Sequence, residues 1–214
     1  MKFSLFARDQ NGGVLVEVTI MLTVVLLIII GVVDFLFAFY QWNAATKAVE
    51  IGARIAAVSD PVAVGLQRLS AVMSPALNPG DPMPYFSVTC DGSTTTCVCT
   101  GTCTGVAGYN TSAMNNVVFG RGNTSCVTPN SPLRIGMCNI FNRIRVSNVI
   151  ITYTQTGLGY AGSPHGPVPT ITVSLQNLPF QFFFLGSLTG FNKVEIPAMT
   201  TTITGEDLSS SAPS

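Results

Sequence analysis

Residues 12–17 read Gly12-Gly13-Val14-Leu15-Val16-Glu17, and this stretch opens the apolar run that decides the fold. The run continues from Val18 to Val33 without a charged residue. A bilayer crossing needs about 20 mostly apolar residues. Desolvating a carboxylate at the mouth of such a run costs several kcal/mol or shifts its pKa. We therefore expect a membrane-spanning helix over about residues 18–40. An ordinary anchor has no reason to carry a costly carboxylate at its entrance, so Glu17 is a candidate functional residue.

The composition indicates an exported protein tethered to a membrane. Hydrophobic residues make up 47% of the chain and charged residues only 9%, against about 25% charged residues in typical soluble domains. Ten basic residues balance ten acidic ones, so no net field favours nucleic acid. The 214 residues suffice for one anchor and one modest domain. We expect no nucleic-acid partner, no small-molecule substrate, no cofactor and no metal.

The ends of the apolar run predict its orientation in the membrane. Tyr40 and Trp42 close the run in the way an interfacial aromatic belt does. Lys2 and Arg8 precede it, which favours a cytoplasmic N-terminus. The expectation is a single-pass protein of the inner membrane whose C-terminal domain lies in the periplasm.

Asp34 is the only charged residue between Val18 and Thr46. One hypothesis, which we favour, places it at the outer headgroup level, about two turns before Trp42, where water reaches it. The other pairs it with a neighbouring subunit or a partner helix.

The helix is expected to continue beyond the membrane, over residues 13–58. Apolar residues recur at helical spacing on one face there: Ala44, Ala48, Ile51 and Ile55. Pro61 ends this helix because it disfavours helical geometry at the residue before it. Asp60 can then cap a second short helix over 60–74, with Pro61 at its first position and Pro75 after its end.

Residues 75–140 are rich in Pro, Thr, Gly, Ser and Asn, and we expect a cysteine-rich loop region there. The region holds all six cysteines of the chain: Cys90, Cys97, Cys99, Cys103, Cys126 and Cys138. An even number of cysteines in one region of an exported chain predicts disulfides, with 15 possible pairings. The alternative is metal binding through Cys97-x-Cys99-x3-Cys103, which lacks a paired C-x2-C motif.

Residues 141–205 alternate as β-strands do, and 206–214 resemble a flexible tail. Strands are expected around Val149–Tyr153 and Thr170–Gln176, with a third over Lys193–Ile196 and Met199–Thr204. The Phe-rich segment Phe180–Leu185 is interpreted as filling the core, and the alternative is an exposed patch on a membrane or partner. The predicted class is α+β: a long transmembrane helix followed by a small extracytoplasmic antiparallel β domain.

Several motifs together resemble one family, the TadE-like minor pilins or pseudopilins of the Tad (tight adherence) type IVb pilus. They are Gly12-Gly13-x3-Glu17, Gly31-Val32-Val33-Asp34-Phe35, Gly52-Ala53-Arg54, Gly190, Met199-Thr200-Thr201-Thr202 and Glu206. Members often carry Glu where Asp34 stands. The cysteine-rich insertion is not part of the common pattern.

The resemblance implies a prepilin leader over residues 1–12, cut by a prepilin peptidase between Gly12 and Gly13. It also implies partners among other pilin subunits and the Tad assembly machinery, with a role in building, priming or tipping the pilus. After the cut, the amine of Gly13 lies one helical turn from Glu17. Pairing these charges within or between subunits offsets the cost of holding each near hydrocarbon. Glu17 and Asp34 are therefore the candidate assembly residues.

Other classes of protein fit the sequence less well. An enzyme is disfavoured because the only histidine, His165, lies in a Gly/Pro-rich loop without a paired carboxylate. The remaining alternatives are unrelated to pili. They are a secreted cysteine-rich binding protein cut near Ala44 or Ala45, and a bitopic anchor that keeps Met1.

Overall fold

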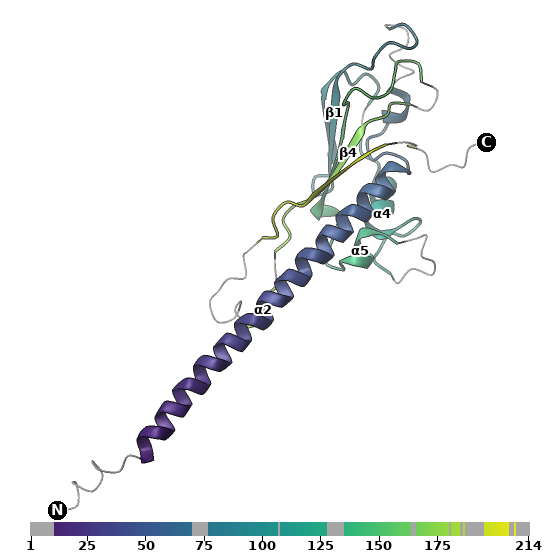
Figure 1. The fold of residues 1–214 in the computed structure, drawn as a ribbon. Helices are drawn as coiled ribbons and strands as arrows, with labels where there is room; N and C mark the ends of the chain where they lie inside the picture. The colour runs from purple at the N-terminus through teal and green to yellow at the C-terminus, as the bar shows by residue number, and fades with distance from the viewer. Residues whose placement is uncertain are drawn as a thin grey trace, which may run out of the picture. The chain divides into compact units, whose positions relative to one another are not determined.

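The computed structural model describes residues 11–69, 77–106, 108–127, 135–163, 166–179, 181–184, 186, 195–205 and 208. The chain forms two units. The first comprises Met1–Tyr40 with Phe180–Val194, and the second comprises Gln41–Pro179 with Glu195–Ser214. The long helix α2 (Asn11–Ala57), labelled in Figure 1, contributes residues to both units.

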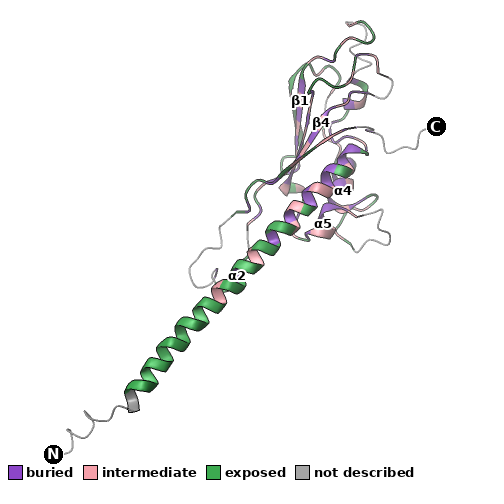
Figure 2. Cartoon of the chain, viewed as in Figure 1, coloured by how far each residue is buried: buried purple, intermediate pink, exposed green. Residues whose placement is uncertain are grey.

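In the first unit, α2 exposes apolar side chains on every side. All residues from Gly13 to Ile29 are exposed, and Figure 2 shows this stretch of the helix in green. The hydroxyls of Thr19 and Thr23 donate to backbone carbonyls of the preceding turn, at Val16 and Thr19, over 2.8 Å each. Their polar atoms are therefore satisfied inside the helix, which suits an apolar surrounding.

The second unit is built on a five-stranded antiparallel sheet in the order β2-β1-β3-β4-β5. Its strands are β1 (Phe86–Asp91), β2 (Thr96–Gly101), β3 (Val149–Thr154), β4 (Thr170–Leu175) and β5 (Thr200–Thr204). The short helices are η1 (Leu66–Arg68), α4 (Thr111–Phe119), α5 (Met137–Ile140) and η3 (Val146–Asn148). A long apolar helix with an antiparallel sheet confirms the predicted α+β class.

One face of the sheet supplies the core of the second unit, because apolar residues alternate along its strands. The inward residues are Phe86, Val88 and Cys90 on β1, Val149, Ile151 and Tyr153 on β3, and Ile171, Val173 and Leu175 on β4. The C-terminal part of α2 adds buried Ala45, Ala48, Val49 and Ala53. Gly52 lies so close to Met137 of α5 that a Cβ there would stand 2.6 Å from its sulfur. Small residues thus allow this close approach.

The second helix predicted over 60–74 does not begin at Asp60. Ala63 instead forms a β-bridge with Tyr109, and Gly65 adopts the left-handed conformation at φ 88°. The N–H of Val62 donates to the hydroxyl of Tyr153 over 3.0 Å. Tertiary hydrogen bonds therefore outweigh the local capping signal, and only the short η1 follows. Residues 70–74 lie outside the described residues.

The region 75–140 is not only loop, because it contributes β1, β2, α4 and α5. Alternating Phe86, Val88 and Cys90 form a half-buried strand, a signal that the Pro- and Cys-rich composition obscured. The third predicted strand is shorter than expected, since β5 begins at Thr200. Glu195 forms only an isolated bridge, to Pro179.

Candidate functional site

The glycine pair lies in the first turn of α2, which begins at Asn11. The first turn of a helix lacks intrahelical acceptors for its N–H groups, and glycine is a weak helix former. This end of the helix can therefore open at low cost. Around Gly13 the structure is unobstructed, since an added Cβ would meet nothing within 4 Å. Glu17 is exposed one turn further along.

The helix beyond Glu17 has the length and composition of a membrane span. From Gly13 to Ala57 it contains an 18-residue window with a mean hydropathy of 2.9, and almost none of that window is buried. A helix that is apolar on all sides and unburied by protein needs an apolar solvent. The structure is thus compatible with single-pass membrane anchoring.

Asp34 is fully buried, at 0% exposure, whereas the favoured hypothesis placed it within reach of water. Its carboxylate accepts hydrogen bonds from two consecutive backbone N–H groups of the first unit. Phe183 donates to Oδ1 over 2.9 Å, and Phe184 donates to Oδ2 over 3.0 Å and to Oδ1 over 3.3 Å. These partners belong to the same chain and lie about 150 residues away. No local pattern in the sequence indicates such a pairing.

The Phe-rich segment is not core filling at the two positions that bind Asp34. Phe183 is 60% exposed and Phe184 is 50% exposed. Phe183 also contacts Phe37 of α2, with 4.4 Å between the ring centroids. The interpretation as core is therefore wrong for Phe183 and Phe184, while Phe180 and Leu185 lie outside the described residues.

The six cysteines form three disulfides. The pairs are Cys90–Cys97, Cys99–Cys103 and Cys126–Cys138. Cys90 and Cys97 are direct partners in the β1–β2 ladder, so strand register selects this pair. The metal hypothesis needs the thiolates of Cys97, Cys99 and Cys103, which are divided here between two bridges. Among the described residues, no three His, Cys, Asp or Glu side chains gather in a way that could hold a metal ion.

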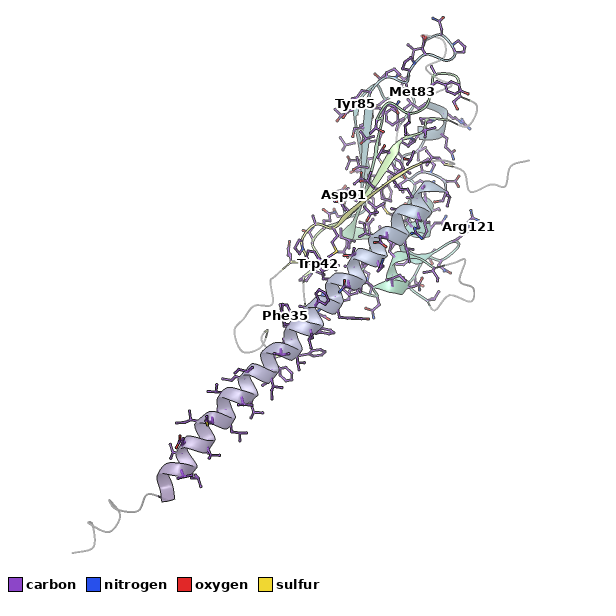
Figure 3. All side chains as sticks on the ribbon, viewed as in Figure 1. Phe35, Trp42, Met83, Tyr85, Asp91 and Arg121 are labelled. Atoms are coloured by element: carbon purple, nitrogen blue, oxygen red, sulfur yellow. A yellow bond between two sulfur atoms is a disulfide. The ribbon has the colours of Figure 1, made fainter. Side chains whose placement is uncertain are left out.

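The outward face of the sheet carries rows of hydroxyls in cross-strand register. Ser87 meets Thr154 at 3.3 Å, Thr89 meets Thr152 at 3.2 Å, and Thr172 meets Thr202 at 3.2 Å. Asp91 is the one charged residue among the paired outward positions, and Figure 3 labels it. Partial burial raises the pKa of Asp91, but hydrogen bonds from Ser93 and Gln176 outweigh this and hold its pKa below the usual value.

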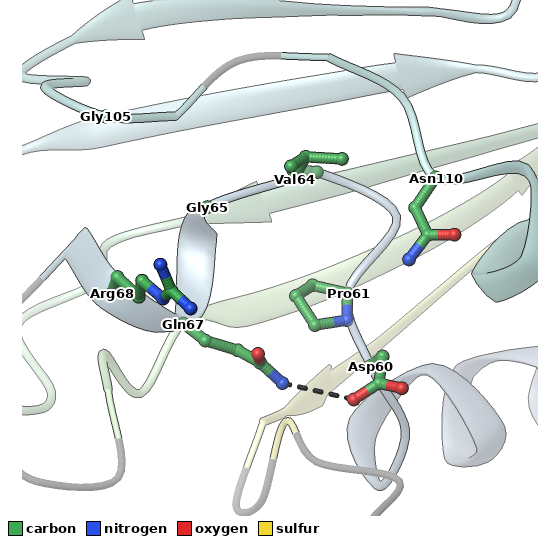
Figure 4. A pocket seen from close by; sticks show the side chains of 9 residues that line it. Asp60, Pro61, Val64, Gly65, Gln67, Arg68, Gly105 and Asn110 are labelled. Carbon is green, nitrogen blue, oxygen red and sulfur yellow. Dashed lines mark hydrogen bonds between the residues drawn. The ribbon is translucent and has the colours of Figure 1, made fainter.

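One polar cavity of about 440 Å³ opens beside η1. Figure 4 shows Asp60, Gln67, Arg68 and Asn110 among its lining residues. The amide of Gln67 donates to Asp60 over 3.3 Å and also to the carbonyl of Leu208. The nine described lining residues include no imidazole, thiol or hydroxyl. His165 lies outside the described residues.

The described residues define a class of protein with a long apolar helix and a small disulfide-bonded α+β domain. The family model described as "TadE-like protein" matches residues 12–54. The match begins at the glycine pair and ends three residues before the end of α2. It confirms, over this segment, the resemblance predicted from the sequence, and the family that it matches is a structural, pilus-related one. Neither the curated proteins nor the solved structures include a significant match to the chain.

Proposed function

We propose that this protein is a minor pilin or pseudopilin. It is a membrane-anchored structural subunit, processed by a prepilin peptidase and needed for assembly of a Tad/Flp type IVb pilus in adhesion or secretion. The observation that carries the proposal is the family match over residues 12–54, because that segment holds Gly12, Gly13 and Glu17. The proposed location is the inner membrane, with the N-terminus in the cytoplasm and the disulfide-bonded domain in the periplasm.

The proposed mechanism uses the first turn of α2. Cleavage after Gly12 releases the amine of Gly13, one turn from the exposed carboxylate of Glu17. Each charge is costly near hydrocarbon, and pairing them offsets that cost. If the pair forms between neighbouring subunits, it fixes the axial register of their helices. The apolar surface of α2 then supplies the contact area between them.

A secreted protein cut near Ala44 or Ala45 would lose a residue of α2 that forms a hydrogen bond within the second unit. Gln41 is buried and accepts a hydrogen bond from Arg143 over 2.7 Å. A cut near Ala45 would remove Gln41 and leave a partly buried guanidinium without this acceptor. Such a loss costs about 1–3 kcal/mol or more for a charged group.

Replacing Glu17 separates processing from assembly. We expect Glu17→Ala to lose residues 1–12 normally, because cleavage depends on the glycine and the leader. The same variant should fail to co-purify with the pilus machinery, because removing one partner of a buried ion pair costs on the order of 3–5 kcal/mol. The measurement is the N-terminal mass of the variant together with the yield of complex after mild crosslinking.

Glu50→Ala is the matched control. Glu50 is a carboxylate on the same helix, and it forms an ion pair with the exposed Lys47 at 2.8 Å. The variant should assemble at the wild-type level, since exposed pairs contribute little. Wild-type yields of complex for Glu17→Ala would mean that Glu17 merely reaches the headgroups, and the proposed mechanism would be abandoned.

A further inference from the structure

We infer that Phe182–Phe184 form a second membrane contact, a loop that lies in the outer lipid interface and is held against α2 by Asp34. The inference rests on the proposed membrane anchoring of α2, but not on pilus assembly. The partner that we infer for this loop is lipid, at the boundary between headgroups and acyl chains.

The position of Asp34 along α2 places the loop at this depth. Asp34 lies seventeen positions after Glu17, which corresponds to about 26 Å of helix at 1.5 Å per residue. The hydrocarbon core of a bilayer is about 30 Å thick. With Glu17 at the inner mouth of the span, Asp34 and the backbone bound to it therefore lie close to the outer boundary of the hydrocarbon.

The hydrogen bonds between Asp34 and the loop satisfy both the carboxylate and the backbone N–H groups at that depth. Irregular backbone is tolerated in lipid only where its N–H groups find partners, and a carboxylate there needs donors. Phe183 and Phe184 give their N–H groups to Asp34 at 2.9 and 3.0 Å. In water, neither the amides nor the carboxylate would require this long-range partner.

The described residues beside Asp34 at this contact are aromatic and carry no charge. Phe183 and Phe184 are half or more exposed, and on α2 the exposed fraction of Phe35, labelled in Figure 3, is 70%. The chain from Val146 to Asn192 contains no Asp, Glu, Lys or Arg. Phe is among the residues that interfacial segments bury at the boundary between headgroups and acyl chains, and large exposed apolar patches are uncommon in water. Lipid contact explains the exposure of these rings, while the buried carboxylate of Asp34 is satisfied by the N–H groups of Phe183 and Phe184.

The test uses the full chain reconstituted in phosphatidylcholine vesicles. Trp42 is the only tryptophan, so Phe184→Trp in a Trp42→Phe background gives one reporter in the loop. We expect a blue-shifted emission that loses most of its intensity with lipids brominated near the headgroups. The expected loss is smaller with bromines at the chain ends, and aqueous iodide should have little effect. The matched control is Val98→Trp in the same background, on exposed β2, which iodide should quench and bromolipids should not.

Two further variants, each combined with the loop reporter, test the role of Asp34. Asp34→Ala should make the reporter sensitive to iodide and remove most bromolipid quenching while the protein still floats with vesicles. Gly31→Ala is the control on the same helix, because an added Cβ there meets nothing within 4 Å, and it should leave quenching unchanged. Unchanged quenching in Asp34→Ala would overturn the role given to the carboxylate.

The outcomes separate this inference from the proposed function. A chain that does not float with vesicles would overturn the membrane anchor and the inference together. A chain that floats but carries an iodide-sensitive reporter in the loop would overturn the inference alone. A blue shift that depends on protein concentration, without bromolipid quenching, would show a second protein on the loop and overturn the assignment to lipid.

Discussion

Tyr153 shows how single polar atoms hold the second unit together. It is the largest fully buried side chain of the described residues, and its hydroxyl accepts the N–H of Val62 over 3.0 Å. Burial raises the pKa of Tyr153 above its usual value, because a phenolate is poorly solvated inside the sheet. This single contact joins the segment after α2 to the C-terminal end of β3.

We expect Tyr153→Phe to lower the free energy of unfolding of the second unit by about 1–3 kcal/mol, because the buried N–H of Val62 loses its acceptor. Chemical denaturation of the detergent-solubilised protein measures this. The wild type should also lose stability as the pH rises above about 10, where tyrosine in the unfolded chain ionises while Tyr153 stays neutral. The variant should show a shallower decline. Equal stability of the two proteins at neutral pH would contradict the contact.

At the scale of elements, alternation in the sequence predicted β3 and β4 closely, because inward apolar residues and outward threonines alternate there. β1 carries the same signal in Phe86–Asp91, but it lies within Pro- and Cys-rich sequence. The register between neighbouring strands cannot be read from any local pattern in the sequence. The pairing of Cys90 with Cys97 and the contact of Thr89 with Thr152 both follow from which strands are neighbours. The bond from Phe183 to Asp34 is likewise a property of the tertiary fold.

Each of the three disulfides joins cysteines that are close in the sequence, so each should form independently of the others. The bridge between Cys126 and Cys138 spans 12 residues. The double variant Cys126→Ala/Cys138→Ala should lose about 3 kcal/mol of stability and should show no free thiols, because the other two bridges form without it. Thiol titration under denaturing conditions and a chemical melt measure both effects. Ser125→Ala, at an exposed neighbour, should change neither. Free thiols in the double variant would contradict the pairing.

At the scale of the whole molecule, the two units differ in the surface that they expose and in how they are stabilised. The first unit, with its exposed apolar helix, is compatible with membrane anchoring, and the second is a disulfide-bonded domain with its own core. The family match lies on the helix, and the sequence predicted that part through the glycine pair and Glu17. The function of the disulfide-bonded domain is not inherited from that match, since its cysteines fall outside residues 12–54.

Gly12 is the residue at which a single substitution should block cleavage of the leader. Gly12→Asp should block cleavage and leave the precursor in the membrane, because a peptidase pocket shaped for a residue without Cβ excludes a larger side chain. Asn11→Asp adds the same charge one residue earlier and should still be processed. Immunoblots of membrane fractions distinguish the precursor from the mature chain, and normal maturation of Gly12→Asp would argue against a prepilin site.

Maturation of this chain as a prepilin is tested by the N-terminal mass of the protein isolated from its membrane. We expect the mature chain to begin at Gly13, with residues 1–12 removed and α2 otherwise intact. A chain that begins near Ala45 would show a secreted protein, and one that keeps Met1 would show an uncleaved anchor. Either result would show that the chain is not matured as a prepilin.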